Sequence, residues 1–356
     1  MMKKQGTIGY AVLGLGIGMA HAEAAAASEN ATLVALCDLD EARLQKAATL
    51  YPNATLYTDA KALFADPEVD IVSICLPSAM HADFAVQAME AGKHVLVEKP
   101  LDITCERAMR IEEARCRTGK RCGVVLQNRY NLNMYPIREA LAQGRLGKLL
   151  LGTFAVKWHR DQRYYDRGGW RGTWEMDGGG SLINQSSHTV DLMQWLMGDV
   201  VSVSSSMSIG NHQIETEDTT VSTLRFAGGA LATLVTTTCA YPGISTEICL
   251  YGSNGSIEAD ADRLKLWKMR EPVQDMDEDE EEEVMLARFG GGNRTAAAAC
   301  GRLYGHRYVV EDMILAVRDG RDPQVMPPEA MKSLAIIEAI YRSAKEGKTV
   351  NLSGNP

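Results

Sequence analysis

The fold is decided by residues 8–19, which read IGYAVLGLGIGM and precede an alanine-rich segment. Ile8 to Leu13 predict a buried strand, and glycines at 14, 16 and 18 predict a tight turn that opens a helix. This order of strand, turn and helix start cradles a pyrophosphate, because backbone N–H groups at a helix N-terminus attract anions. The segment therefore predicts a dinucleotide-binding fold.

A carboxylate follows the second predicted strand. Asp38 lies directly after the apolar residues 33–37, twenty positions beyond Gly18. A carboxylate at this place accepts hydrogen bonds from ribose hydroxyls and would repel the 2′-phosphate of NADP, so NAD is the expected cofactor. In the usual glycine motif of such a turn, GxGxxG, the sixth residue is a glycine that lets the helix pack closely on the sheet. Here the sixth residue is Met19, so we expect the helix to approach the sheet less closely than usual. The candidate cofactor contacts of this region are Gly14, Gly16, Ile17, Gly18 and Asp38.

Strands and helices alternate from residue 7 to about 127. The predicted strands are 8–13, 33–37, 54–57, 71–76, 95–97 and 122–126. Alternation predicts parallel pairing, and right-handed crossovers bring the carboxyl ends of the strands to one edge. We therefore expect a doubly wound Rossmann domain at 1–127, with Gly14, Asp38, Pro77 and Lys99 at its cofactor edge.

The sequence changes in character after Arg129. It predicts helices at 132–143, 182–197, 308–317 and 328–346, and extended runs at 149–158, 201–207, 219–226, 230–240, 246–251 and 263–267. The polar, β-branched strands and the tight turns between them are typical of an antiparallel sheet. We expect an α+β domain at 128–356, built on a large, open, mainly antiparallel sheet, whose final helices pack back near the seam between the domains.

Charge excludes some classes of function. Eight acidic residues within 275–283 account for all but one unit of the net charge of −9. No basic stripe remains for a phosphate backbone, so we expect no nucleic-acid partner. The acidic run is interpreted as a solvated loop, and it lacks the glycine and ligand spacing of a calcium loop, so no metal site is expected.

Cysteine usage and hydropathy indicate the compartment. The eight cysteines form no CxxC pair, and Cys37, Cys75 and Cys249 lie in apolar runs, so we expect reduced thiols and a cytoplasmic protein. The segment from Lys3 to Ala22 imitates a secretory signal, but its residues are needed for the strand and the phosphate turn. No apolar run reaches 18 residues, and we expect no membrane span.

Lys99 is a candidate catalytic group. It follows the strand at 95–97 and Glu98, and Pro100 fixes the backbone behind it. Most lysines are surface residues, but this one is held at the cofactor edge of the predicted sheet. Its ammonium could there hydrogen-bond a substrate hydroxyl and stabilise charge as an alkoxide forms.

A second group of candidates lies on the predicted helix 182–197. Asn184, His188 and Asp191 follow the DGGG loop at 177–180, and their i, i+4 and i+7 spacing predicts one helical face. An isolated histidine on a buried helix is more often a core group than a catalyst. Its polar neighbours favour His188 as a general base, with Asn184 orienting the alcohol and Asp191 holding the ring.

Further contacts are predicted around these groups. Aromatic and basic residues could form a sugar platform or line the pocket, although tryptophans are also ordinary packing residues. The candidate substrate contacts are Lys99, Tyr130, Trp158, Trp170, Asn184, His188 and His306, and Arg171 is a candidate cofactor contact.

The chain resembles the Gfo/Idh/MocA family of sugar and polyol dehydrogenases over nearly its whole length. The resemblance rests on the glycine turn, CLPS at 75–78 with His81, EKP at 98–100 and GGGSLINQSSHTVD at 178–191. It implies a Rossmann domain, a second domain whose sheet makes homodimer or homotetramer contacts, and catalytic roles for Lys99 and His188. The cofactor contacts that it adds are Leu76, Pro77, His81, Glu98 and Lys99.

Many members of that family have Asp where this chain has Asn184. An amide cannot relay a proton, so His188 or Lys99 must carry the proton transfer. The Asn form resembles a subset that acts on glycosides, sugar nucleotides or amino sugars. The acidic run at 275–283 looks like an insertion relative to common members.

These observations predict NAD-dependent oxidation of a secondary hydroxyl of a glycoside, sugar nucleotide or polyol, with ring C3 as the candidate carbon. Asn184, His188 and Lys99 would be the catalytic residues, and hydride would pass to nicotinamide C4. One alternative is a glycoside hydrolase that retains NAD and oxidises its substrate transiently. Another is a non-catalytic NAD-binding regulator, because folds tolerate loss of chemistry.

Overall fold

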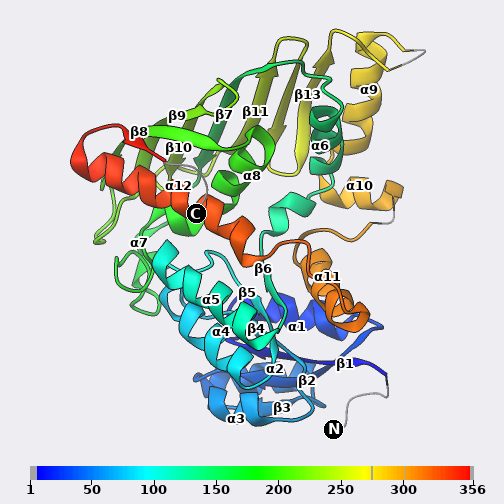
Figure 1. Cartoon of the computed structure of the whole chain (residues 1–356), viewed down its shortest axis with the longest axis vertical. Coiled ribbons are helices and arrows are strands. Elements are labelled where there is room, and N and C mark those ends of the chain that lie inside the picture. Colours follow the sequence, from blue (N-terminus) through cyan, green and yellow to red (C-terminus); the bar gives the residue numbers. More distant parts are fainter. Residues whose placement is uncertain (1–5, 274–275, 301, 353–356) are drawn as a thin grey trace. The chain divides into compact units, whose positions relative to one another are not determined.

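The computed structural model describes residues 6–273, 276–300 and 302–352, and it divides the chain into two compact units (Figure 1). The first unit contains the chain up to Gln127 together with Gly305–Met331. The second contains Asn128–Tyr304 and the chain from Lys332. In this grouping Gly305–Met331 lies with the first unit, and the division of the chain into domains at 1–127 and 128–356 stays a prediction.

That segment belongs to the first unit because it packs there. Helix α11 (Gly305–Asp319) contacts α1 and the strands β1 and β5. The Val124 N–H donates to the Val325 carbonyl at 3.0 Å, and the Asn30 amide donates to Glu311 at 2.8 Å. These contacts join residues about 200 or more positions apart in the sequence, which local patterns cannot reveal.

One parallel sheet forms the core of the first unit. Its strands are β1 (Ile8–Leu13), β2 (Ala31–Cys37), β3 (Thr55–Tyr57), β4 (Ile71–Ile74), β5 (His94–Val97) and β6 (Cys122–Val124), in the order β3-β2-β1-β4-β5-β6. The middle strands are apolar and buried along their length because helices cover both faces of such a sheet. The helices are α1 (Gly18–Ala26), α2 (Glu41–Leu50), α3 (Ala60–Ala65), α4 (His81–Glu90) and α5 (Cys105–Thr118), with a short turn η1 (Ser78–Met80) before α4. This is the predicted doubly wound Rossmann architecture.

A larger sheet forms the second unit. Its strands are β7 (Leu149–Lys157), β8 (Val200–Ser208), β9 (Thr219–Phe226), β10 (Leu231–Thr237), β11 (Ser245–Gly252), β12 (Gly255–Asp260), β13 (Arg263–Met269) and β14 (Val350–Asn351), in the order β13-β12-β11-β7-β10-β9-β8-β14. Every pairing is antiparallel except that of β7 with β10, which is parallel. The mainly antiparallel sheet expected from the sequence is confirmed.

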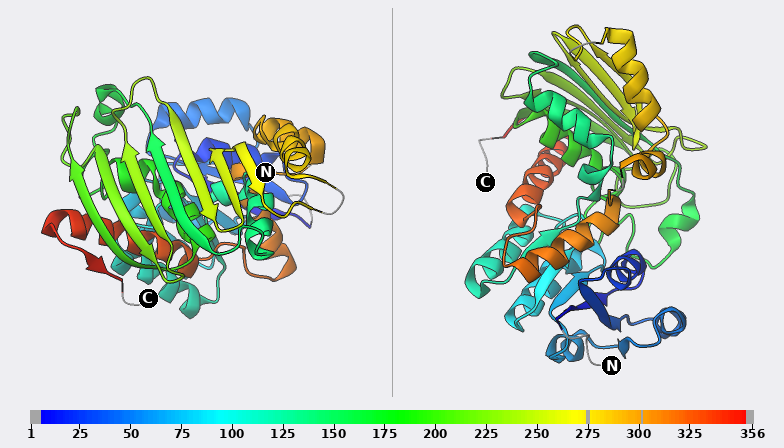
Figure 2. Two further views of the ribbon diagram at one scale, coloured as in Figure 1. Left: turned by 90° about the horizontal axis from the view of Figure 1, so that it is seen from above. Right: turned by 90° about the vertical axis from the view of Figure 1, so that its right-hand side faces the viewer.

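Helices cover one face of this sheet (Figure 2). The helical elements of this part of the chain are η2 (Gln127–Tyr130), α6 (Met134–Ala142), α7 (Gln162–Asp166), η3 (Ser181–Gln185), α8 (Ser187–Met197), α9 (Glu278–Phe289), α10 (Asn293–Cys300) and α12 (Pro327–Glu346), the last of which begins in the first unit. Along β9 buried and exposed residues alternate, as a strand with one covered face requires. Apolar residues also lie on the sheet with 40–50% exposure, among them Leu151, Val221 and Leu231.

Two local predictions are wrong. The expected single helix at 182–197 is interrupted, because η3 is a π-helical turn and Ser186 leaves helical geometry before α8 begins. The acidic run expected to be a loop forms the start of α9, where Asp277 and Glu280 make a capping box. Glu281 of this run is buried, and it forms an ion pair with Arg145 at 2.7 Å. Asp275 lies outside the described residues.

Candidate active site

The glycine turn after β1 has the shape that a pyrophosphate requires. Gly14 has φ +92°, and a Cβ there would lie 2.4 Å from the Cys75 carbonyl oxygen, so the turn needs glycine. A Cβ on Gly16 would meet nothing within 4 Å. Ile17, at the start of α1, is half exposed, and no side chain caps the helix. The turn thus offers an open helix N-terminus, and its residues fit a bound dinucleotide.

Gly18 corrects the expectation of a looser helix. A Cβ on Gly18 would lie 2.6 Å from Cγ1 of Val12, which is closer than real atoms approach. Helix α1 therefore packs tightly on the sheet at Gly18, although Met19 occupies the usual glycine position.

The two glycines provide a matched pair of variants. We expect Gly18→Ala to lower the free energy of unfolding by about 1–3 kcal/mol, because the added methyl group overpacks the helix–sheet contact. Gly16→Ala should leave the melting temperature unchanged and weaken NADH binding, because its Cβ would occupy open space beside the helix N-terminus. Thermal unfolding and NADH titration of both variants check this pattern. Equal NADH affinity in Gly16→Ala and wild type would place the pyrophosphate elsewhere.

Asp38 closes the glycine turn from the end of β2. Its Oδ2 accepts the Leu15 N–H at 2.7 Å and its Oδ1 accepts the Asp40 N–H at 2.9 Å. Arg43 lies 3.6 Å from the same carboxylate, but its side chain is more than half exposed. Asp38 thus ties the turn to β2 at the edge where the ribose contact is predicted.

His81 links two other segments of this edge. Its Nδ1 lies 2.7 Å from the Pro100 carbonyl oxygen and its Nε2 lies 2.9 Å from the Leu76 carbonyl oxygen. The ring is buried and braces the backbone beside Pro77 and Lys99. The structure thus gives His81 a bracing role, and its predicted contact with the cofactor stays a prediction.

Glu98 and His306 lie together inside the first unit. Glu98 Oε1 is 3.0 Å from Nε2 of His21 and 3.4 Å from Nε2 of His306, and its Oε2 accepts the Lys99 N–H at 3.0 Å. Burial would raise the pKa of Glu98, but the hydrogen bonds from both histidines hold it well below its usual range. Glu98 therefore anchors the backbone of Lys99. A substrate contact of His306 stays a prediction.

In the second unit, Asn184 is held at both ends of its amide. Its Nδ2 donates to Oδ1 of the buried Asp177, and its Oδ1 accepts Nε2 of Gln185 at 2.6 Å. Gln185 also contacts the Tyr164 hydroxyl at 2.7 Å and accepts Nε of Arg160 at 3.1 Å. This network orients an amide on η3, and π-helical turns of this kind are frequent at functional sites.

His188 lies in the first turn of α8 and is partly exposed. Asp191, one turn later, binds Arg129 through both carboxylate oxygens at 2.7 and 2.8 Å, and both side chains are almost fully buried. Such a bidentate pair is strongly oriented. Asp191 thus ties α8 to the segment before α6, a role that the sequence did not predict.

The aromatic candidates lie in the same unit. Trp158 donates to Thr246 at 2.9 Å at the end of β7, which anchors its ring. Arg171 stacks on the rings of Trp170 and Tyr164, at 4.5 and 4.9 Å from their centroids. Tyr130 is buried. The substrate or cofactor contacts of Trp158, Trp170, Arg171 and Tyr130 stay predictions.

Three buried polar residues around η3 escaped the sequence analysis: Gln185, Glu217 and Tyr341. Gln185 contacts Asn184 directly, and Glu217 accepts the N–H groups of Gly180 and Leu182. The segment DGGG at 177–180 was the available signal, since glycines mark places where other groups approach closely.

Glu217 should make stability depend on pH. Burial raises its pKa to about 7, against the opposing hydrogen bonds from backbone N–H groups. Because the folded pKa exceeds the unfolded one, the native state holds the proton more tightly, and its stability falls as pH rises through 7. Relative to Glu217→Gln, wild-type protein should lose about 2 kcal/mol of unfolding free energy between pH 5.5 and 8.

Three groups near Glu217 have pKa values outside this pH range. Burial places the pKa of Tyr341 and of Tyr165 well above 10, and hydrogen bonds, acting against burial, lower that of Asp218 to about 2. Urea unfolding of both proteins at several pH values measures the difference. A difference independent of pH would contradict the assignment.

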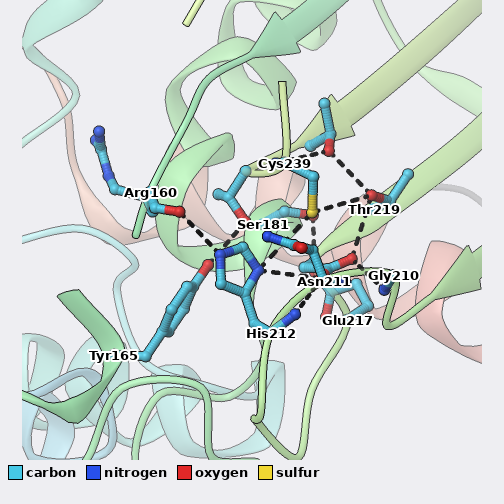
Figure 3. Close-up of polar contacts among 12 residues, drawn as sticks. Arg160, Tyr165, Ser181, Gly210, Asn211, His212, Glu217, Thr219 and Cys239 are labelled. Atoms are coloured by element: carbon cyan, nitrogen blue, oxygen red, sulfur yellow. Dashed lines mark hydrogen bonds and ion pairs between the residues drawn. The ribbon is translucent and has the colours of Figure 1, made fainter. Parts of the chain in front are cut away.

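Two clusters in the described part of the chain contain residue types that bind metals. One is His21, Glu98 and His306, and the other is His212, Asp218 and Cys239. Figure 3 shows His212 beside Cys239, with one ring nitrogen 2.8 Å from the Arg160 carbonyl oxygen. Its other nitrogen lies 3.0 Å from Oδ2 of Asp218. This second cluster anchors the loop before β9.

In the described ranges, no helix is both long and apolar enough to cross a membrane. No disulfide joins the cysteines whose side chains the structure describes.

The Rossmann sheet, the open glycine turn and the polar helix start of the second unit define an NAD-binding oxidoreductase. Residues 8–126 match the model of an oxidoreductase family with an NAD-binding Rossmann fold, and residues 136–258 match the GFO/IDH/MocA C-terminal domain. The chain therefore belongs to the Gfo/Idh/MocA family. Within it, the chain is an oxidoreductase with an NAD-binding Rossmann domain.

Three relatives illustrate this. The WlbA dehydrogenase from Bordetella pertussis, solved in complex with NADH and UDP-GlcNAcA, is 32% identical, covers 99% of both chains and has a TM-score of 0.89. D-glucoside 3-dehydrogenase from Escherichia coli is 32% identical over 47% of this chain and 46% of that protein. D-apiose dehydrogenase from Paraburkholderia graminis is 26% identical over 91% of this chain and 84% of that protein.

Proposed function

We propose that the protein oxidises a secondary hydroxyl of a glycoside or sugar nucleotide at ring C3. The observation that supports the proposal is the fixed orientation of the Asn184 amide. Hydrogen bonds to Asp177 and from Gln185 hold this amide, four residues before His188. An amide fixed in this way can orient a substrate hydroxyl toward a base.

Each residue then has one task in the oxidation. Bound NAD would supply the hydride acceptor, nicotinamide C4. His188 takes the hydroxyl proton, since imidazole exchanges protons near neutral pH. Lys99 donates a hydrogen bond to the same oxygen and stabilises its developing charge. The C–H and O–H bonds break, a ketone forms, and two electrons leave with the hydride.

Two relatives support the proposed substrate class. One has a name that places oxidation at position 3 of a glucoside, and the other was solved with a nucleotide-linked sugar acid. With Asn at position 184, the chain also resembles the subset of the family that acts on glycosides, sugar nucleotides or amino sugars. We therefore propose a sugar that carries a substituent on its anomeric carbon.

Deuterium transfer tests the carbon. Methyl glucoside and UDP-GlcNAc uronic acid, each labelled with deuterium at C3, are incubated with the protein and NAD. We expect the label to appear in the reduced cofactor by mass spectrometry, with no transfer from the same sugars labelled at C2 or C4. Transfer from C2 or C4 would overturn the C3 assignment.

The same mixtures test the alternatives. Release of the aglycone without net NADH would replace the dehydrogenase with an NAD-retaining hydrolase. Absence of both reactions over a broad sugar panel would favour an NAD-binding regulator.

We also propose that the protein is a cytoplasmic homodimer or homotetramer. The described cysteines form no disulfide, which supports a reducing compartment. The exposed apolar residues on the large sheet, such as Val221 and Leu231, support contact with a second copy. Light scattering of Val221→Glu with Leu231→Glu should show a smaller particle than wild type, and an unchanged mass would remove this face as the interface.

A further inference from the structure

The helical segment that carries Asn184 and His188 begins without a cap of its own. A helix leaves its first N–H groups without partners inside the helix. Gly180 is the N-cap residue of η3 and has no side chain that could accept a hydrogen bond. The acceptors come instead from Glu217, two residues before β9, and from Tyr341 in α12.

Glu217 serves three successive N–H groups. Its Oε2 accepts Gly180 N at 3.1 Å, its backbone oxygen accepts Ser181 N at 3.0 Å, and its Oε1 accepts Leu182 N at 2.8 Å. Tyr341 serves the fourth, because its hydroxyl accepts Ile183 N at 3.3 Å and donates to Glu217 Oε1 at 3.1 Å. The pair therefore replaces a local helix cap.

The glycine triplet allows this approach. A Cβ on Gly179 would lie 2.0 Å from the Tyr341 hydroxyl oxygen, and one on Gly180 would lie 1.9 Å from the Glu217 carbonyl oxygen. No other residue type fits at either place. The glycines before η3 are thus explained by contact with the capping pair.

Glu217 is itself held firmly. The neighbouring Asp218 accepts the N–H groups of Gly210 and Asn211 at 2.8 and 2.9 Å and contacts His212 at 3.0 Å. Figure 3 shows Glu217 close to this loop. Glu217 and Tyr341 are 2% and 8% exposed. A rigid anchor of this kind can transmit position to the helix start.

We propose that Glu217, together with Tyr341, is a positioning residue of the dehydrogenase site, which sets the place of Asn184 and His188 by capping η3. The inference rests on the proposed function, since it assumes that those two residues act on the sugar. Glu217 acts through them, and misplacing a reacting group by about 1 Å can lower a rate about 100-fold.

Two variants test the capping pair. Glu217→Gln retains the volume but has one acceptor oxygen, so its NH₂ group would face an N–H group of Gly180 or Leu182. We expect kcat to fall about 10- to 100-fold while the NADH dissociation constant stays within about twofold. Tyr341→Phe removes only the acceptor of Ile183, so its effect on kcat should be smaller and in the same direction.

A second Glu–Tyr pair provides the control. Tyr251 donates to Glu258 at 2.8 Å between β11 and β12, away from η3. Glu258→Gln and Tyr251→Phe should retain wild-type kcat. Equal loss in the two pairs would reduce Glu217 to a general stabilising residue and overturn the inference.

A double-mutant cycle with Asn184 distinguishes an effect on positioning from a general effect on folding. If Glu217 acts through Asn184, Glu217→Gln should cost less than about threefold in an Asn184→Ala background, because contacting groups are not additive. Full additivity would overturn the inference. Should Glu217→Gln fail to fold, the same cycle with Tyr341→Phe decides.

The His188→Ala variant distinguishes failure of this inference from failure of the proposed function. Wild-type activity of His188→Ala would refute the proposed function. An inactive His188→Ala together with a fully active Glu217→Gln would refute only the positioning role of Glu217.

Discussion

Replacing His188 with alanine is expected to lower kcat about 100-fold or more, without changing NADH affinity. Loss of a general base typically costs a factor of about 10²–10⁴, because water must then take the hydroxyl proton. The cofactor cradle lies in the other unit of the chain, so the NADH dissociation constant should remain that of wild type. Steady-state kinetics with a reactive sugar and NADH titration measure the two effects.

A second histidine provides a control for the general effect of removing an imidazole ring from this unit. His159 packs edge-on against Tyr241 at the end of β7, and His159→Ala should retain nearly the wild-type kcat. Added imidazole should restore part of the activity of His188→Ala, since it can take the proton in the vacated space. A wild-type kcat for His188→Ala would refute its role as base.

Replacing Lys99 with methionine is expected to lower kcat/KM for the sugar about 10²–10³-fold. Methionine retains much of the apolar stem but cannot donate a hydrogen bond to the substrate oxygen, and loss of one such donor typically costs this much. The fold should persist, because the backbone N–H of residue 99, which donates to Glu98, is retained in the variant. Kinetics at saturating NAD and thermal unfolding check both statements.

The exposed Lys61 in α3 provides the control for a lost lysine charge, and Lys61→Met should match wild type. Lys99→Met combined with His188→Ala should cost far less than the product of the single effects, because groups that act on one oxygen behave as a unit. Multiplicative effects would indicate that the two residues serve different steps.

Much of the fold could be predicted because its strands have simple patterns. β1 and β9 begin and end at the predicted residues, since a continuous apolar run marks a strand buried on both faces and strict alternation marks one covered face. β12 was missed because GSIEAD is polar and short. The helix α9 was missed although Asp277 and Glu280 offered a capping box, because the run of charge suggested a loop.

The candidate site was less predictable. Spacing along the chain marked Asn184 and His188, but it assumed one regular helix and missed the π-helical turn before Ser186. The partners of these residues come from distant segments, and neither Glu217 nor Tyr341 has a local signal. His306 shows the same limit, since its contact with Glu98 joins residues 208 positions apart. Such contacts depend on the tertiary fold, which brings distant segments of the chain together.

The central claim is that Lys99 and His188 act on the same hydroxyl. A crystal structure of the protein with NADH and the sugar that it oxidises measures this directly. We predict that Nζ of Lys99 and a ring nitrogen of His188 both lie about 2.6–3.2 Å from one substrate oxygen, whose carbon faces nicotinamide C4. The claim would be contradicted if either group lay beyond the reach of a hydrogen bond or a single bridging water from that oxygen.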